Sequence, residues 1–152
     1  MLRRASNRRN GGTLVEMAVV LPVVFLLIIG LIVGGIGIFH YQEVARLARE
    51  AARWASVHGT DYAREKNTTA ATASDVYDNA IKPNVATLDT SKITYSVTWD
   101  KENSPWSLTA ADNFERPVGN TVSVTVTYQW MPEWFMIGPI NLSSTSTVPM
   151  SY

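Results

Sequence analysis

The sequence of 152 residues contains no cysteine. Disulfide bonds, thiolate catalysis and cysteine-ligated metal sites are therefore excluded. Only two histidines occur, His40 and His58. Without cysteine, and without a carboxylate at helical spacing to both histidines, the sequence predicts no metal site and no cofactor.

Sequence motifs of catalysis are missing as well. The chain has no glycine-rich phosphate loop and no serine or threonine motif for nucleophilic attack, and its carboxylates show no convincing acid/base pairing. Acidic and basic residues balance at 13 each. No basic patch follows the N-terminal region, so nucleic-acid binding has no support. The sequence therefore predicts a protein that is not an enzyme and does not bind nucleic acid.

Charge is almost absent from one long segment, residues 14–39. Its only strongly polar side chain is Glu16. At about 1.5 Å of rise per residue the segment spans roughly 39 Å as a helix, enough to cross a hydrocarbon core of about 30 Å with some tilt. We therefore expect a transmembrane helix over residues 12–39. Pro22 and the glycines inside the segment need not end a helix in a membrane.

Acidic residues are absent from the part that precedes this segment, where Arg3, Arg4, Arg8 and Arg9 lie. The positive-inside tendency places the N-terminus in the cytoplasm and everything after about His40 outside. A cleaved secretory signal peptide has a similar order of regions, but its apolar region is typically only about 7 to 15 residues long. The segment is therefore interpreted as a retained single-pass anchor in the cytoplasmic membrane.

The pattern becomes amphipathic over residues 40–59. Apolar side chains follow helical spacing along one face and charged ones gather on the other. The apolar set is Val44, Leu47, Ala48, Ala51, Trp54 and Ala55. Arg46 and Glu50 form an i,i+4 pair. The pattern predicts that the transmembrane helix continues as one rod to about His58 and stops at Gly59.

The remaining residues, 60–152, are expected to form an exported head. Residues 60–69 are predicted to be a loop, and residues 70–81 a short helix that ends before Pro83. Strands are expected at about residues 92–99, 120–130 and 140–150, because apolar side chains alternate there with Ser, Thr, Asn or Gln. The polar segment 100–118 is interpreted as a long loop.

These elements predict an α+β fold. The alternating strands indicate an antiparallel sheet of about three or four strands with one wet face, and the apolar face needs a cover. The outer half of the long N-terminal helix and the short helix at residues 70–81 are the available covers. The apolar alternating positions are Ile93, Tyr95, Val97 and Trp99; Val122, Val124, Val126, Tyr128 and Trp130; and Ile140, Leu142, Val148 and Met150.

Two further features are candidates for contacts. Gly30 and Gly34 form a GxxxG pair, which is often a helix-packing face in membranes. Trp134 and Phe135 lie in an apolar segment between two strands. They are interpreted either as a partner-docking tip or as plain packing against the sheet edge.

Several stretches carry a resemblance to a known family. The basic start, then "GGTLVEM" at residues 11–17, and an apolar helix that continues into "YQEVARLAREAARWASVHG" at residues 41–59 resemble the TadE-like proteins. Residues 122–150, "VSVTVTYQWMPEWFMIGPINLSSTSTVPM", are similar to the closing region of that family. TadE-like proteins are minor pilin-like components of the Tad, or Flp, type IV pilus machinery. The resemblance implies a pilin-like fold, with partners among other pilin-like subunits and the pilus assembly platform.

The resemblance also implies processing. Such proteins are cut by a prepilin peptidase after a glycine on the cytoplasmic side, and related pilins carry a glutamate as the fifth mature residue. A cut between Gly11 and Gly12 removes residues 1–11 as a leader and makes Glu16 the fifth residue. A cut after Gly12 would make Glu16 the fourth. Met17 departs from the aromatic residue that more often follows the glutamate.

The carboxylate of Glu16 allows two interpretations. An ionised side chain at the centre of a membrane helix costs roughly 2.5 to 3.5 kcal/mol, so such residues usually have partners. The cationic N-terminus at Gly12 of a neighbouring subunit would be one. Alternatively, Thr13 and Glu16 fit the capping-box pattern at the start of a helix, where the dipole favours a negative charge.

The sequence thus predicts a processed minor pilin-like subunit that acts in pilus assembly, initiation or adhesion. The alternative is an unprocessed single-pass anchor that carries a small extracytoplasmic binding domain. A permanent anchor has no need of the Gly11–Gly12 pair followed by Glu16, so the leader is the feature that separates the two hypotheses.

Overall fold

The computed structural model describes residues 10–100, 103–111, 117–132 and 138–152. The chain divides into two compact units, Met1–Ile36 and Gly37–Tyr152. Helix α1 (Asn10–Val57) contributes residues to both. The predicted helix that ends near His58 is therefore confirmed, and Pro22 lies inside it. The candidate tip residues Trp134 and Phe135 lie outside the described residues.

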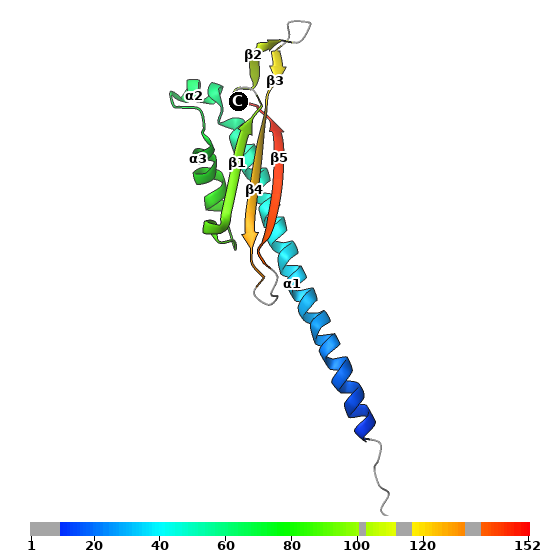
Figure 1. Ribbon diagram of the computed structural model, residues 1–152. Helices are drawn as coiled ribbons and strands as arrows, with labels where there is room; N and C mark the ends of the chain where they lie inside the picture. Colours follow the sequence, from blue (N-terminus) through cyan, green and yellow to red (C-terminus); the bar gives the residue numbers. More distant parts are fainter. Residues whose placement is uncertain (1–9, 101–102, 112–116, 133–137) are drawn as a thin grey trace, which may run out of the picture. The chain divides into compact units, whose positions relative to one another are not determined.

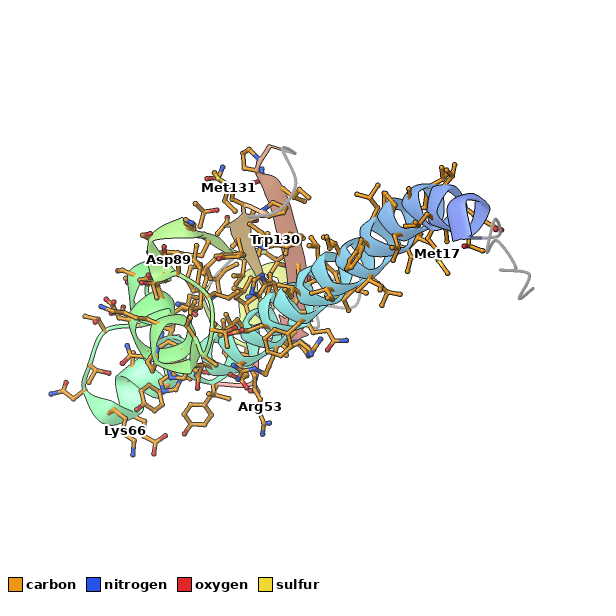
Figure 2. All side chains as sticks on the ribbon, turned by 90° about the horizontal axis from the view of Figure 1, so that it is seen from below. Met17, Arg53, Lys66, Asp89, Trp130 and Met131 are labelled. Atoms are coloured by element: carbon orange, nitrogen blue, oxygen red, sulfur yellow. The ribbon has the colours of Figure 1, made fainter. Side chains whose placement is uncertain are left out.

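In the first unit, α1 is apolar and uncovered. Leu14 is 71% exposed and Leu31 is 79% exposed. The most apolar 18-residue window of α1 has no part buried inside the chain, and α1 is long and apolar enough to cross a membrane. Met17 projects away from the ribbon in Figure 2. Such a surface is stable in lipid and costly in water, as the composition predicted.

The second unit is built on a three-stranded antiparallel sheet. Its strands are β1 (Ile93–Trp99), β4 (Thr121–Trp130) and β5 (Ile140–Pro149), in the order β1-β4-β5. In register, Val97 pairs with Val124 and Val124 with Ser146. The sheet lies against the part of α1 that belongs to this unit (Figure 1). The predicted α+β fold, with a long N-terminal helix and a small antiparallel sheet, is confirmed.

The core lies between the sheet and α1. Every second residue of β4 from Val122 to Tyr128 is buried, so the predicted alternation is confirmed there. The helix contributes a face made largely of alanine, and its fully buried apolar residues are Val44, Leu47, Ala48, Ala51, Ala52 and Ala55. The predicted cover of the sheet by the amphipathic part of α1 is therefore present.

The outer face of the sheet carries hydroxyl groups in cross-strand pairs. Ser123 and Thr147 are 2.7 Å apart between their hydroxyl oxygens, as are Thr125 and Thr145. Thr127 and Ser143 form a third pair at 2.9 Å. Such pairs stabilise neighbouring strands without burying apolar area. The predicted wet face is thus a ladder of paired hydroxyls.

Two predictions about the connecting segments were wrong. Residues expected to form a loop begin with helix α2 (Thr60–Lys66), which ends at Asn67 in the left-handed conformation. The long loop expected at residues 100–118 contains a two-stranded hairpin of β2 (Trp106–Ala111) and β3 (Pro117–Gly119). Helix α2 is short and polar, and β2 and β3 span only six and three residues, so none of them gives a hydrophobic period long enough to identify it.

The predicted short helix is present but ends later than expected. Helix α3 (Ala73–Val76) starts with a capping box, in which Thr72 and Asp75 exchange hydrogen bonds. It continues through a π-helical turn η1 (Tyr77–Ile81) and a 3-10 turn η2 (Lys82–Asn84). Pro83 is tolerated because the first turn of a new helical segment needs no backbone donor there.

The C-terminus closes on the end of α1. The Gly59 amide donates a hydrogen bond to the Tyr152 carbonyl at 3.1 Å, and the Ser151 amide donates to the Ser56 carbonyl at 3.0 Å. A Cβ atom on Gly59 would clash with the Tyr152 carbonyl and would lie 2.8 Å from the Met150 methyl. Only glycine therefore permits this close approach.

The Gly59→Ala substitution should destabilise the head, because the added methyl group must displace the backbone of Tyr152. We expect a loss of about 1 to 3 kcal/mol, as in other overpacked sites, seen as a lower Tm in thermal unfolding of the full chain in detergent. Gly138→Ala is the matched control, since nothing lies within 4 Å of its added Cβ. Equal Tm values for the two variants would contradict this account of Gly59.

Candidate assembly site and helix clasp

The glycine pair of the candidate cleavage site lies within the first turn of α1. Gly11 and Gly12 are exposed, and a Cβ atom added to either would meet nothing within 4 Å. Glycine inside a helix costs roughly 0.5 to 1 kcal/mol relative to alanine. Packing within the described chain therefore gives no reason for two glycines at this place.

The side chain of Glu16 is exposed, and no hydrogen bond or ion pair joins it to any described residue. Because α1 begins at Asn10, Thr13 lies inside the helix and not at its N-cap. The capping-box interpretation of Thr13 and Glu16 is therefore wrong for this chain. Glu16 is left as a charged group in an apolar helix, without a partner among the described residues.

Gly30 and Gly34 lie one turn apart on an exposed part of α1. Nothing lies within 4 Å of a Cβ atom added to either glycine. Residues four apart share one face of a helix, so this face could admit a second helix at close range. Within the described residues it has no cover.

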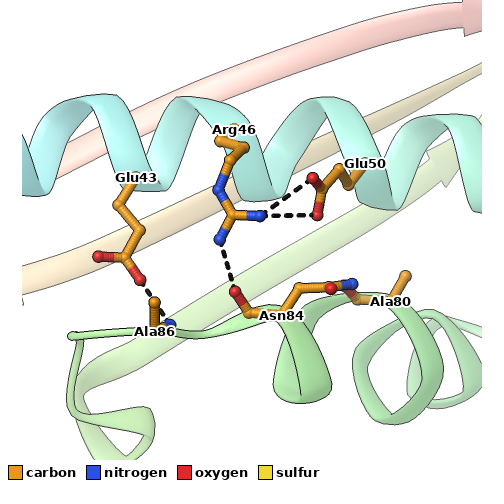
Figure 3. Close-up of polar contacts among 6 residues, drawn as sticks. All are labelled: Glu43, Arg46, Glu50, Ala80, Asn84 and Ala86. Carbon is orange, nitrogen blue, oxygen red and sulfur yellow. Dashed lines mark hydrogen bonds and ion pairs between the residues drawn. The ribbon is translucent and has the colours of Figure 1, made fainter.

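A second group of polar residues joins α1 to the segment after η2. Glu43 is only 6% exposed, and its carboxylate accepts hydrogen bonds from the Ala86 amide at 2.8 Å and the Thr87 amide at 3.0 Å. The Thr87 hydroxyl donates a third, short hydrogen bond. We call this set of contacts the Glu43 clasp. It fixes a loop without secondary structure to the helix (Figure 3).

Arg46 holds the same segment at a second point. Its guanidinium donates to both oxygens of Glu50, at 3.0 and 3.2 Å, and to the Asn84 carbonyl at 2.6 Å (Figure 3). The pair with Glu50 was predicted from the spacing, whereas the bond to Asn84 was not. Arg46 therefore ties η2 to α1.

The Glu43 clasp also sets the charge of this region. Burial raises the pKa of Glu43, but the hydrogen bonds from Thr87 and Ala86, with the nearby Arg46, outweigh that effect. The pKa of the carboxyl therefore lies below its ordinary value of 4.5, and Glu43 is ionised at neutral pH. The sequence offered one signal for it, a glutamate beside the buried positions of an apolar helix face.

An open groove of about 590 Å³ runs beside the Glu43 clasp. Its lining consists of Phe39, Tyr41, Gln42, Glu43, Ala45, Arg46, Arg49 and Ala86. Most of this lining is the exposed side of α1, and the loop residue Ala86 forms part of the opposite wall. The groove contains no nucleophile and base arranged for catalysis.

Neither histidine belongs to a candidate metal site in the described part of the chain. His40 packs edge-on against the rings of Tyr128 and Trp130, at centroid distances of 5.7 and 5.8 Å. His58 stacks on Trp54 at 3.9 Å, and its Nδ1 lies 2.8 Å from the Trp54 carbonyl oxygen. Both rings therefore act in packing.

The comparison with protein families bears on the first helix. The family described as TadE-like protein matches residues 11–53. The matched part contains Gly11, Gly12, Glu16, the Gly30–Gly34 face and the helical side of the Glu43 clasp. No curated protein and no solved structure matches the chain. The resemblance is therefore confirmed for α1 and not for the sheet.

The Glu43→Gln substitution should lower the stability of the head at neutral pH, because the hydrogen bonds would then reach a neutral acceptor. Bonds to a charged group contribute about 1.5 to 3 kcal/mol, compared with about 1 for neutral pairs. Thermal unfolding of the full chain in detergent, measured by tryptophan fluorescence, should show a lower Tm at pH 7.

The difference in Tm between wild type and Glu43→Gln should depend on pH in a defined direction. Folding lowers the pKa of Glu43. The stability that the ionised carboxylate contributes is therefore complete above the ordinary pKa and is lost as the pH falls through the pKa of the folded state. The difference in Tm between wild type and Glu43→Gln should narrow below about pH 4.5. Glu50→Gln, which alters a half-exposed pair, is the control and should change Tm little. A difference that widens in acid would refute the assignment.

Proposed function

We propose that this chain is a minor pilin-like subunit of a Tad-type pilus, which a prepilin peptidase trims and which acts in pilus assembly, initiation or adhesion. The observation that carries the proposal is the family match over residues 11–53, together with a Glu16 that has no partner among the described residues. The TadE-like family is a family of pilus components with an N-terminal apolar helix, and this chain has such a helix.

The topology belongs to the same proposal. The four arginines before the apolar segment keep the N-terminus in the cytoplasm, and the sheet-bearing unit lies outside the bacterial cytoplasmic membrane. This orientation leaves Gly11 and Gly12 on the cytoplasmic side, where the peptidase acts. It also places the exposed apolar part of α1 in the bilayer, where its side chains face lipid.

Cleavage gives Glu16 its partner. Hydrolysis of the Gly11–Gly12 peptide bond consumes one water and leaves an α-amino group on Gly12, which is cationic near neutral pH. In a bundle of parallel helices, that ammonium group can approach Glu16 of the neighbouring subunit. The ion pair forms only when the two helices are in one axial register, so it orders the subunits as they join.

The Gly30–Gly34 face supports lateral association of the same helix. In lipid, helices associate through close van der Waals contact, which small residues permit. No described residue of the chain covers these glycines, so a neighbouring helix can pack there. The partners are other pilin-like subunits and the assembly platform in the membrane.

The first test concerns processing. The intact mass and N-terminal residue of the protein should be measured after isolation from membranes, with and without the prepilin peptidase. We expect a chain that starts at Gly12 only when the peptidase is present, and an uncut chain for Gly11→Val. Gly138→Val, a change at an open site, should be cut normally. A chain that keeps its leader in every case would support the unprocessed anchor with a binding domain.

The second test concerns assembly. Glu16→Gln keeps the size of the side chain and removes its charge, so processing should be normal while association with neighbouring subunits is lost. Cross-linking in membranes should yield at least about tenfold less multimer, since a loss of 1.4 kcal/mol already has this effect. Glu50→Gln is the control on the same helix. Normal multimers with Glu16→Gln would refute the proposed ion pair.

A further inference from the structure

The groove beside the Glu43 clasp begins where the apolar part of α1 ends. Phe39 and Tyr41, which line it, are 53% and 48% exposed. Exposed aromatic rings at the end of a membrane-crossing helix are typical of the interface between lipid tails and headgroups. The end of the groove that Phe39 and Tyr41 line therefore offers apolar surface suited to the level of a lipid headgroup.

The residues that line the groove carry one net positive charge, because the ionised Glu43 carboxylate opposes the two guanidinium groups of Arg46 and Arg49. The carboxylate of Glu43 is occupied by Ala86 and Thr87, and that of Glu50 is occupied by Arg46. Arg49 also lines the groove, is exposed, and has no acidic partner among the described residues. The groove therefore combines apolar surface at Phe39 and Tyr41 with the guanidinium of Arg49, which has no acidic partner among the described residues, and this combination matches an amphiphile with an anionic head.

The direction of α1 tilts the Arg49 side chain toward the apolar part of the helix. Side chains on an α-helix lean toward its N-terminus, and the apolar part of α1 is N-terminal to the groove. Arg49 lies ten residues after Phe39, or about 15 Å along the axis. Its long aliphatic stem can reach back over part of that distance while the guanidinium stays in the polar layer.

We propose that this groove binds an anionic phospholipid of the leaflet from which α1 emerges. The phosphate lies against Arg49, whose planar fork of donors suits phosphate oxygens, and the glycerol and upper acyl chain lie along Phe39 and Tyr41. The Glu43 clasp and Arg46 keep the opposite wall in place. This inference rests on the proposed membrane anchoring, because the groove meets lipid only if the apolar helix lies in a bilayer.

The test uses the full chain in nanodiscs that contain equal amounts of phosphatidylcholine and phosphatidylglycerol. Native mass spectrometry of the released protein counts the lipids that stay bound. One basic residue near an anionic lipid surface contributes about 1 kcal/mol, so wild type should retain phosphatidylglycerol over phosphatidylcholine by about fivefold. Arg49→Gln should bring this ratio close to one.

Arg53→Gln is the matched control. It removes the same charge one turn further along α1, from a residue that lines a different depression and projects away from the ribbon in Figure 2. The phosphatidylglycerol ratio of this variant should stay at the wild-type value. If Arg53→Gln lowers the ratio as much as Arg49→Gln, the effect is general attraction to an anionic surface, and the groove is not the site.

A second measurement places the lipid. Because the chain has no cysteine, Gln42→Cys carries a single fluorescent label in the groove, and Val57→Cys carries one outside it. Brominated phosphatidylglycerol should quench the label at position 42 and spare the label at position 57. Cross-linking of position 42 to a second copy of the chain, without quenching, would assign the groove to a protein partner and overturn the proposal.

The outcomes distinguish a failure of the membrane anchoring from a failure of the lipid site. A chain that does not incorporate into the nanodiscs at all contradicts the membrane anchoring, and the lipid site fails with it. A chain that incorporates but retains both lipids equally contradicts only the lipid site, and the proposed pilin-like function stands.

Discussion

The close packing of an alanine-rich helix face against valines of β4 is the contact on which the rest of the head depends. Ala48, Ala51, Ala52 and Ala55 are fully buried in the same cluster as Val122, Val124 and Val126. Small side chains on the helix let the sheet come close, and the β-branched valines fill the remaining space with few rotamers to lose. Without disulfide bonds, this packing must hold the head together.

The same closeness explains the glycines and polar contacts around the core. At Gly37 an added Cβ would lie 2.8 Å from the Trp130 ring, so the helix and the end of β4 also approach closely there. The loop at Ala86 and Thr87 has no regular hydrogen-bond partners of its own, and the Glu43 carboxylate satisfies its amides. Buried backbone donors need such partners, which makes a carboxylate on an otherwise apolar helix face useful.

The sequence alone predicted the elements whose apolar side chains recur with a regular period. The unbroken apolar run, the helical spacing of Val44 to Ala55 and the alternation of β4 each predicted an element that the structure contains. Helix α2 and the β2–β3 hairpin were missed, because elements of three to seven residues are too short for a hydrophobic period to identify them. The Glu43 clasp was also missed, since its partners lie 43 and 44 residues away along the chain, a distance over which local patterns carry no information.

Two glutamates of α1, Glu16 and Glu43, lie among apolar neighbours, and they differ in whether the chain itself supplies hydrogen-bond donors to the carboxylate. Glu43 is buried, and its carboxylate receives all its hydrogen bonds from within the chain, so its cost is recovered on folding and it needs nothing else. Glu16 is exposed in the apolar part of the helix, and the described chain offers it no donor. Charged side chains within membrane helices usually pair with another group, which makes Glu16 a candidate for a contact with a second molecule. Folding of the described chain thus accounts for Glu43 but supplies no partner for Glu16, and the subunit association proposed above would supply one.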